Sequence, residues 1–286
     1  MNVIDCKAIS KQYRRHLKSE AEKLSITPSL AVVIVGNDPA SMTYVNNKKK
    51  ACDEVGFRSE VLYMSEDSTT EDVMAAVARF ANRDDICGVM VQLPLPEHID
   101  ENQVISVIPP EKDVDALSAI SMGKLVLGHP VYKPCTPSGI LLILKCLGVP
   151  LSGANCVIVG RSNIVGKPLA AMLTQEDATV TLCHSKTKYL ANITKQADIL
   201  ISAVGKPNFI TADMVSEGTV VIDVGINRAD DGKLVGDVCF DDVKEIAGAI
   251  TPVPGGVGIM TVTSLLTNTY NAALVQSEPR RTKGEM

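Results

Sequence analysis

The run SLAVVIVG, residues 29–36, limits the possible folds more than any other stretch of the sequence. It is almost continuously apolar and ends at a glycine, which is typical of a strand buried on both faces. Strand patterns recur at 155–160 and 197–205, and amphipathic helical patterns separate them. One helical pattern offers two N-cap candidates, Ser68 and Thr69, each followed three residues later by an acid. Regular alternation of strand and helix predicts an α/β fold with mostly parallel sheets and right-handed crossovers.

A chain of 286 residues is long for one hydrophobic core, so we expect two domains. We place the first over residues 1–119 and the second, a Rossmann-type dinucleotide-binding domain, over 120–261. The stretch from about 109 to 139 is rich in proline, glycine and single charges, and it forms the crossing between them. The apolar helix at about 262–276 is expected to pack back on the first domain, before a polar tail at 277–286.

The composition argues against several classes of protein. A net charge of −5 does not suit a general nucleic-acid binder, which needs a basic excess to neutralise phosphates. The first residues contain no apolar stretch of a signal peptide, and the apolar run at 139–144 is too short to span a bilayer. The eight cysteines show neither CxxC pairs nor zinc-ligand spacing. We therefore expect reduced thiols, no metal site, no membrane partner and a cytoplasmic location.

Three consecutive lysines at 48–50 differ in their surroundings. With about 100° of rotation per residue, Lys48 falls near the middle of an apolar arc of a predicted helix, whereas Lys49 and Lys50 point away from it. Tyr44 lies one turn before Lys48, so their side chains can meet. Two interpretations are open: Lys48 extends its ammonium into water, or the ammonium lies in a cleft where its pKa is lowered.

The segment CVIVGRSNIVGKPLAAML, residues 156–173, combines a strand, a glycine loop and a helix. This arrangement places a pyrophosphate at a helix N-terminus. Gly160 and Gly166 are one residue further apart than the outer glycines of GxGxxG, and Ser162 replaces the middle glycine. The pattern alone fits an ordinary strand-to-helix turn equally well.

The next strand pattern ends in CHSKT, where an NAD-binding fold normally carries an acid for the ribose 2′-hydroxyl. His184, Ser185 and Lys186 would instead accept a 2′-phosphate. Arg161 could bind the same phosphate with its planar guanidinium. Together these residues favour NADP over NAD as the cofactor.

Other strand patterns also end in residues of interest. Gln92 ends an apolar strand at 86–96, where ligands of open α/β sheets bind. Its amide either bonds to the next loop or orients a neighbouring ammonium. The stretch DVGINR, 223–228, is positioned to bring Gly225 and Ile226 beside the nicotinamide, although a plain exit from a strand fits it equally.

Two acids stand in the stretch PPEKDVDAL. Asp113 and Asp115 are two residues apart, on the same side of an extended segment. One is expected to cap or brace the loop, and the other to receive a ligand with two adjacent N–H donors. The Pro/Gly segments at 132–140 and 251–261 either bring the backbone close to a ligand or form tight turns.

Taken together, the ordered motifs resemble those of the bifunctional methylenetetrahydrofolate dehydrogenase/methenyltetrahydrofolate cyclohydrolase family over nearly the whole chain. The motifs are YVNNKKKACDEVGF, VQLPLP, KDVDAL, KPCTPSG, GRSNIVGKP, CHSKT, DVGINR, GKLVGDV and TPVPGGVG. The resemblance implies a first domain that binds folate, NADP as cofactor, and tetrahydrofolate one-carbon derivatives as substrates. It also implies a homodimer that serves one-carbon metabolism and purine biosynthesis.

The resemblance assigns roles residue by residue. It implies that Lys48 is the catalytic lysine, that Gln92 holds it in place, and that Tyr44 lies against the aminobenzoyl ring. Asp115 would bind the amino and N3–H edge of the pterin. Further folate contacts are expected at Leu93, Pro254 and Gly255. Cofactor contacts are expected at Gly160, Arg161, Ser162, His184, Ser185, Gly225 and Ile226, with Thr136 near the domain boundary.

The resemblance implies two reactions in one cleft. A hydride passes from the methylene group of 5,10-methylenetetrahydrofolate to the nicotinamide, which leaves the 5,10-methenyl cation. Water then adds to the cation, and the ring opens to 10-formyltetrahydrofolate. Lys48 is the candidate for the proton transfers of the second step, because desolvation lowers the pKa of a lysine.

Two residues depart from the family pattern. Ala116 stands where glycine usually follows the second aspartate, and Ile259 stands where proline follows GGVG. Alanine resists a positive φ, and isoleucine lacks the fixed φ of proline. Three alternatives therefore stay open: a dehydrogenase with little cyclohydrolase activity, a catalytically silent NADP-binding regulator, and a dehydrogenase of the shikimate type.

Overall fold

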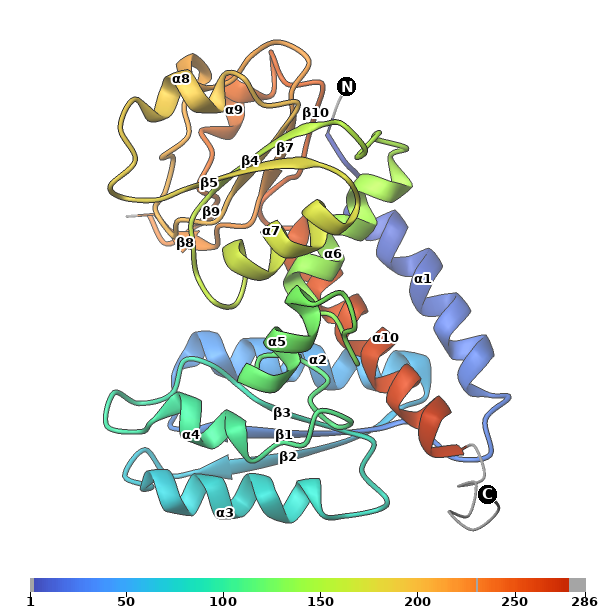
Figure 1. Ribbon diagram of the computed structural model, residues 1–286. Coiled ribbons are helices and arrows are strands. Elements are labelled where there is room, and N and C mark those ends of the chain that lie inside the picture. Colours follow the sequence, from blue (N-terminus) through green and yellow to red (C-terminus); the bar gives the residue numbers. More distant parts are fainter. Residues whose placement is uncertain (1–2, 230, 278–286) are drawn as a thin grey trace. The chain divides into compact units, whose positions relative to one another are not determined.

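The structure is a computed structural model that describes residues 3–229 and 231–277 (Figure 1). The chain divides into two compact units that interleave along the sequence. Of the described residues, the first unit contains 12–124, 130–135 and 265–277, and the second contains 3–11, 125–129 and 136–264. The predicted domain bounds and the packing of the last helix stay predictions. Apart from Ser277, the predicted tail lies outside the described residues.

The first unit contains a three-stranded parallel sheet of order β2–β1–β3. β1 (Ser29–Val35) is buried at every residue, as its apolar pattern predicts. It pairs with β2 (Arg58–Met64) on one side and with β3 (Gly88–Val91) on the other. Figure 1 shows α2 (Pro39–Val55) and α3 (Thr70–Ala81) on opposite faces of this sheet.

The face under α3 forms a hydrophobic core. Val73, Val77 and Phe80 of α3 are buried there. They belong to one cluster with alternate residues of β1 and β3, namely Ala31, Val33, Val35, Val89 and Val91. Because side chains alternate across a strand, the same strands leave their other residues for the face under α2.

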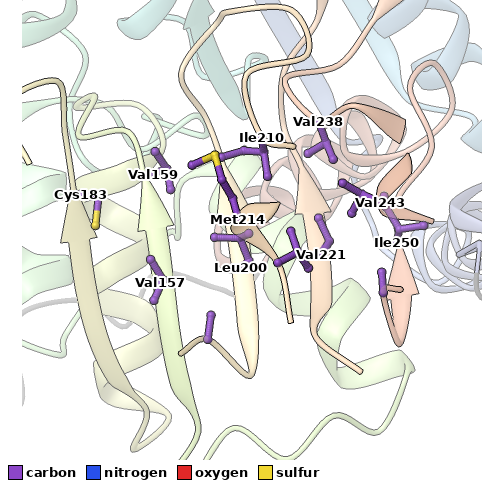
Figure 2. Close-up of a cluster of buried hydrophobic side chains, with 13 residues drawn as sticks. Val157, Val159, Cys183, Leu200, Ile210, Met214, Val221, Val238, Val243 and Ile250 are labelled. Carbon is purple, nitrogen blue, oxygen red and sulfur yellow. The ribbon is translucent and has the colours of Figure 1, made fainter. Parts of the chain in front are cut away.

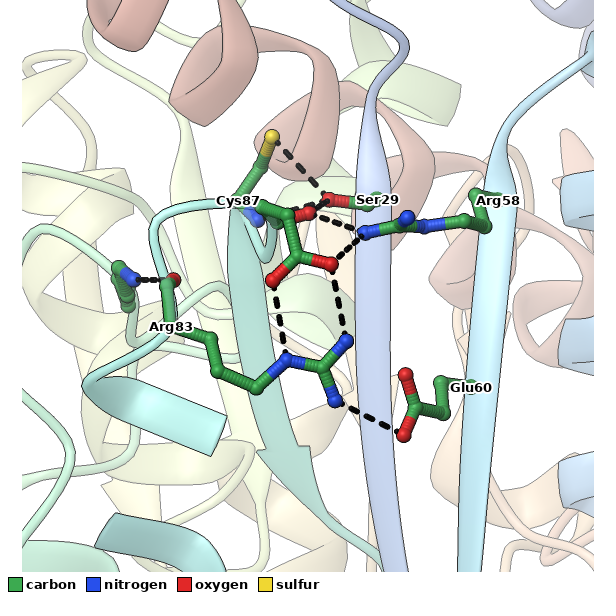
Figure 3. Close-up of polar contacts among 7 residues, drawn as sticks. Ser29, Arg58, Glu60, Arg83 and Cys87 are labelled. Carbon is green, nitrogen blue, oxygen red and sulfur yellow. Dashed lines mark hydrogen bonds and ion pairs between the residues drawn. The ribbon is translucent and has the colours of Figure 1, made fainter. Parts of the chain in front are cut away.

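A network of charges lies at the amino ends of the same strands (Figure 3). The Asp85 carboxylate accepts two hydrogen bonds from Arg83, at 3.0 and 2.9 Å, and one from Arg58 at 2.6 Å. Arg83 also donates to Glu60 at 2.9 Å, and the hydroxyl of Ser29 donates to the backbone oxygen of Asp85 at 2.7 Å. Arg83 and then Arg58 hold the pKa of Asp85 well below its usual value. The network braces the edge of the sheet opposite to the ends where ligands bind.

The second unit contains a five-stranded parallel sheet of order β10–β7–β6–β4–β5. Its strands are β4 (Asn155–Val159), β5 (Thr179–Cys183), β6 (Ile199–Ser202), β7 (Val220–Asp223) and β10 (Ala249–Ile250). β4 lies between β5 and β6, so the direction in which strands are added reverses beside it. Such a switch point is where open α/β sheets bind ligands. The predicted α/β class, with parallel sheets and a Rossmann-type part, is confirmed.

One face of this sheet carries the core shown in Figure 2. Val157 and Val159 of β4 lie there with Leu200 of β6 and Val221 of β7. The short elements that pack against them are α8 (Leu190–Thr194), η1 (Ala212–Met214) and α9 (Phe240–Val243). The helix α7 (Gly166–Gln175) contacts β4 and β5.

The remaining elements are α1 (Cys6–Ala21), α4 (Glu101–Ser106), α5 (Ala119–Val126), α6 (Cys135–Cys146), α10 (Val257–Ser277) and the hairpin of β8 (Asn227–Arg228) and β9 (Leu234–Val235). α4 and α5 lie where no regular element is predicted, and α5 falls inside the expected crossing. β3 ends earlier than predicted, because Pro94 and Pro96 lack the N–H that a ladder needs. None of the helices within residues 3–229 and 231–277 has the length and apolar character that a membrane crossing requires.

α3 begins at one of its two predicted caps. The Thr69 hydroxyl accepts from the backbone N–H of Asp72 at 3.2 Å, and the Asp72 carboxylate accepts from the Thr69 N–H at 3.0 Å. These reciprocal bonds form a capping box.

We expect Thr69→Ala to lower the free energy of unfolding by about 1 kcal/mol, because a hydroxyl cap is lost. Ser68→Ala, at the neighbouring candidate, should change it by less than about 0.5 kcal/mol. Urea unfolding followed by circular dichroism measures both variants. Equal losses in the two would contradict the assignment of the cap to Thr69.

Candidate active site and cofactor loop

α2 has clear signals at both ends, which fix the face on which its side chains lie. The Asp38 carboxylate accepts from the Ser41 N–H at 2.7 Å, and Pro39 occupies the first turn. At the other end, Gly56 adopts a left-handed conformation with φ 77°. Between these ends, Lys48 is half-buried while Lys49 is exposed. The difference predicted between consecutive lysines is therefore present.

Lys48 and Gln92 are joined by a hydrogen bond from Lys48 Nζ to Gln92 Oε1 at 2.8 Å. Gln92 directly follows β3, and its backbone N–H donates to Val33 O at 2.8 Å. Its side-chain Nε2 donates to Leu93 O at 2.7 Å. Both predicted uses of this amide occur, since it bonds to the next loop and also holds an ammonium. The predicted contact between Gln92 and Lys48 is confirmed.

The ammonium of Lys48 is partly removed from water. Burial lowers the pKa of Lys48 below its usual value, while the charges of Asp115 and Cys135 oppose that shift. Its hydrogen-bond acceptor, Gln92, is itself buried, with 8% of its surface exposed. The interpretation in which Lys48 extends its ammonium into water is therefore wrong. One turn earlier, Tyr44 is half-buried, and burial raises the pKa of its phenol.

Asp113 is the acid that braces the loop. It is buried, and its carboxylate accepts from the backbone N–H groups of Leu117 at 3.3 Å and Ser118 at 3.0 Å. It also accepts from the hydroxyl of Ser121 at 2.6 Å. These bonds hold the start of α5. The prediction that one acid of the pair caps or braces the loop is confirmed for Asp113.

Asp115 points to different partners, because the segment is a turn rather than an extended strand. The N–H of Ala116 donates to Asp113 O at 2.9 Å, and Ala116 has φ 57°. The predicted extended segment with both acids on one side is therefore wrong. The Asp115 carboxyl interacts with Lys48 and with the thiol of Cys135. Burial raises the pKa of Asp115, and the charge of Lys48 opposes the rise.

The second unit brings together the two glycines of the predicted cofactor loop. Gly160 follows β4 with φ 122°, and an added Cβ would lie 2.1 Å from Ala203 O. A Cβ on Gly166, at the start of α7, would lie 2.0 Å from Gly160 O. Only glycine permits these approaches. The loop from Gly160 to Gly166 therefore folds tightly at the switch point, with exposed Arg161 and Ser162 between the two glycines.

The residues expected around a 2′-phosphate stand at the next strand end. The N–H of Gly160 donates to Cys183 O at 2.9 Å, so that Arg161 and His184 follow paired positions of β4 and β5. The backbone N–H of His184 donates to the Thr187 hydroxyl at 2.8 Å, which shapes a turn that exposes Ser185. This juxtaposition agrees with the predicted set, whose role stays a prediction.

Gly225 and Ile226 follow β7 at the same edge of the sheet. The N–H of Gly225 donates to Asp223 Oδ1 at 2.9 Å, and Ile226 is 44% exposed. A Cβ on Gly258, in the first turn of α10, would lie 3.4 Å from Cδ1 of Ile226. Thr136, on α6, shares a hydrogen bond of 3.0 Å with the hydroxyl of Thr261.

Pro254 and Gly255, the remaining predicted folate residues, lie between β10 and α10 in the second unit. Gly255 has φ 106°, a conformation that favours glycine. Tyr44, Lys48, Gln92, Leu93 and Asp115 belong to the first unit. A shared substrate contact with Pro254 and Gly255 stays a prediction.

Comparisons with known proteins bear on both units. Residues 4–115 match the tetrahydrofolate dehydrogenase/cyclohydrolase catalytic domain, and residues 134–277 match the NAD(P)-binding domain of the same name. The chain belongs to the tetrahydrofolate dehydrogenase/cyclohydrolase family. A bifunctional protein FolD of Acetivibrio thermocellus is 49% identical over 279 residues, which is 96% of this chain and 98% of that protein.

Solved structures of family members agree with this fold. The bifunctional FolD of Campylobacter jejuni has a TM-score of 0.94 at 45% identity, over 96% of this chain and 99% of that one. The FolD of Trypanosoma brucei, solved with NADP and an inhibitor, has a TM-score of 0.92 at 38% identity. That comparison covers 97% of this chain and 98% of the other. Within residues 3–229 and 231–277, no three His, Cys, Asp or Glu side chains could together hold a metal ion.

Two residues near the family's catalytic motif are additional to those predicted. The thiol of Cys135 donates to Val114 O at 3.3 Å, and burial followed by the charge of Asp115 raises its pKa. Asn268 Nδ2 donates to Val114 O at 2.8 Å and to Lys133 O at 2.9 Å. Cys135 stands inside the motif KPCTPSG, and Asn268 interrupts an otherwise apolar helix. These are the sequence signals that could have identified them.

Asp115→Asn should lower the pKa of Lys48 further. An anionic neighbour favours the protonated amine, so its removal favours the neutral form. Reductive ¹³C-methylation and an NMR titration of the ligand-free protein would follow the amine, with Lys48→Arg assigning its resonance. Asp53→Asn, an exposed position on α2, is the control and should leave the pKa unchanged. A rise in the pKa of Lys48 in Asp115→Asn would refute this electrostatic account.

Asn268→Leu should destabilise the first unit by about 1–3 kcal/mol, because two buried carbonyls lose their shared donor. Asn271→Leu is the matched control, since Asn271 is exposed on the same helix. Urea unfolding would compare the two variants. Comparable stability in both would show that the Asn268 amide does not hold these loops.

Proposed function

We propose that this chain oxidises 5,10-methylenetetrahydrofolate with NADP and then hydrolyses the methenyl product to 10-formyltetrahydrofolate. The observation that carries the proposal is the bond of 2.8 Å from Lys48 Nζ to Gln92 Oε1, in surroundings that lower the pKa of Lys48. A lysine held in this way can exchange protons near neutral pH. Family membership supplies the substrate class, since relatives at about half identity are bifunctional FolD proteins.

The dehydrogenase step requires mainly positioning of the reactants. NADP, when bound, accepts the hydride that leaves the methylene carbon. The residues present fit this cofactor, because a Cβ at Gly160 or Gly166 would fill the space into which the loop folds. Gly160 and Ser162 would hold the pyrophosphate at the start of α7. Arg161, His184 and Ser185 would bind the 2′-phosphate, and Gly225 and Ile226 would lie along the nicotinamide.

The cyclohydrolase step requires a proton acceptor and a proton donor. As water adds to the methenyl carbon, the neutral amine of Lys48 takes one of its protons. The resulting ammonium returns a proton to N5 of the folate as the bond from carbon to N5 breaks, and 10-formyltetrahydrofolate remains. Gln92 Oε1 keeps Nζ in place through both transfers, because it accepts from either protonation state. Tyr44 would contact the aminobenzoyl ring, and Asp115 the pterin N–H groups.

The structure offers no observation that favours a monofunctional dehydrogenase. Ala116 keeps the left-handed conformation, with φ 57°, that the usual glycine would adopt. The strain of about 1 kcal/mol is small compared with the stability of a domain. A silent regulator would have no need of Lys48, Gln92 and Asp115 together. The resemblance further supports a homodimeric cytoplasmic enzyme that supplies purine biosynthesis, and these three statements rest on it alone.

Lys48→Met should reduce hydrolysis of 5,10-methenyltetrahydrofolate by about 10²–10⁴-fold, the usual contribution of general acid–base catalysis. The matched control is Lys49→Met, one residue away on the exposed face. It should keep its activity within about twofold. In wild type, hydrolysis should fall as pH drops through the lowered pKa of Lys48, since the ammonium cannot accept a proton.

A single assay with 5,10-methylenetetrahydrofolate and NADP or NAD, read at separate wavelengths for reduced cofactor and methenyl product, measures both steps. Accumulation of methenyl product by wild type would indicate a dehydrogenase with a weak second step. Failure to reduce either cofactor would reject the proposed function.

A further inference from the structure

The motif GKLVGDV, residues 232–238, carries no role in the proposed reaction, yet its aspartate is the most completely satisfied acid of the second unit. Asp237 is fully buried, with 0% of its surface exposed. Its carboxylate accepts from Ser202 Oγ at 3.3 Å, Val204 N at 2.7 Å, Gly205 N at 3.2 Å, Lys206 N at 3.0 Å and Asn227 Nδ2 at 2.9 Å. A carboxylate offers about four lone-pair sites. Both oxygens of Asp237 are therefore fully used by protein donors.

A second buried acid, Asp223, completes the arrangement from the end of β7. Its Oδ1 accepts from Gly225 N and Asp237 N, both at 2.9 Å, and its Oδ2 accepts from Val238 N at 2.9 Å. Burial raises the pKa of Asp223 to about 6, although these three backbone donors oppose the rise. The two motifs DVGINR and GKLVGDV therefore interlock. Asp223 holds the backbone of the second motif, while Asp237 holds the side chain of Asn227 from the first.

Two glycines make this interlock possible. A Cβ on Gly225 would lie 2.2 Å from Asp237 Oδ1, and a Cβ on Gly236 would lie 1.8 Å from Asp223 Oδ2. Neither distance is compatible with a side chain. Each carboxylate therefore lies directly against the backbone of the other motif.

The donors to Asp237 come from two loops at the carboxyl edge of the sheet. Val204, Gly205 and Lys206 follow β6, and Ala203, just before them, presents its carbonyl to Gly160 of the glycine loop. Asn227 is the immediate neighbour of Ile226 after β7. One carboxylate thus fixes the segment that supports the glycine loop as well as the segment that carries Ile226.

We propose that Asp237 is a positioning residue for the cofactor, which sets the placement of the loops after β6 and β7 and thereby the affinity for NADP. The proposal rests on the proposed function, because that function assigns Gly160 and Ile226 to the cofactor. Asp237 acts through these loops and touches no reacting atom. A purely structural acid would stabilise the fold without affecting one ligand more than the other.

Asp237→Asn tests the proposal with little change in shape. Whichever oxygen becomes an NH₂ group then faces two N–H donors, so at least one loop must shift. Isothermal titration calorimetry with NADP should show a dissociation constant at least tenfold higher. Hydrolysis of 5,10-methenyltetrahydrofolate, measured without cofactor, should stay within twofold. Amide hydrogen exchange at residues 204–206 of the ligand-free protein should accelerate.

Asp241→Asn is the matched control, since Asp241 is 86% exposed in the same unit and pairs only with Lys244 in the ion pairs of the described residues. It should change neither NADP affinity nor hydrolysis. Asn227→Ala removes a single donor to Asp237, should raise the NADP dissociation constant about threefold, and decides the question if Asp237→Asn does not fold.

An unchanged NADP affinity in the folded Asp237 or Asn227 variant would overturn the inference while leaving the proposed function intact. Equal loss of NADP binding and hydrolysis would show a general structural role and would also overturn it. A wild-type protein that binds neither NADP nor NAD would instead remove the proposed function and, with it, the basis for assigning the loops to the cofactor.

Discussion

The hydrogen bond from Lys48 to Gln92 is the interaction on which the candidate active site depends. Removing an ammonium from water is unfavourable, and a buried amide oxygen compensates for only part of the loss. The lowered pKa of Lys48 is the result of this imbalance. Gln92 can serve in this way because its backbone continues the pairing of β3 with β1 through the bond to Val33, so the amide cannot move away. The parallel sheet therefore fixes the position at which the proton is exchanged.

The two units place their polar groups by the same rule. In each, side chains and loops at the carboxyl ends of parallel strands converge, while the opposite edge carries structural contacts such as the Arg83–Asp85 pair of Figure 3. In the first unit this edge holds Gln92, and in the second it holds the glycine loop after β4. The loops are short and tightly bonded to the strands. Positional accuracy at both sites therefore comes from the sheets rather than from the loops themselves.

Local patterns in the sequence predicted the features that depend on a single element. The helical wheel of α2 separated Lys48 from Lys49, and the strand end located Gln92. Features that depend on several elements could not be predicted in this way. The turn at Asp113–Ala116 requires a positive φ at an alanine, which the sequence does not favour. Asn268 and Cys135 acquire their meaning only when α10 and α6 bring them to Val114. The short helix α5 likewise depends on the carboxylate of Asp113, eight residues before Ser121.

The buried acids show how a structural carboxylate can be distinguished from one that is available to a ligand. Asp113 and Asp237 both use backbone N–H groups, which are rigid donors that no substrate can displace without moving a loop. Asp115 instead meets a thiol and the charge of Lys48. A thiol is a weak donor, so it leaves most of the acceptor capacity of the carboxylate unused. The raised pKa of Asp115 reflects this incomplete compensation, which a ligand with paired N–H groups would supply. The number and kind of protein donors, rather than burial itself, therefore separate the acid that binds from the acids that brace.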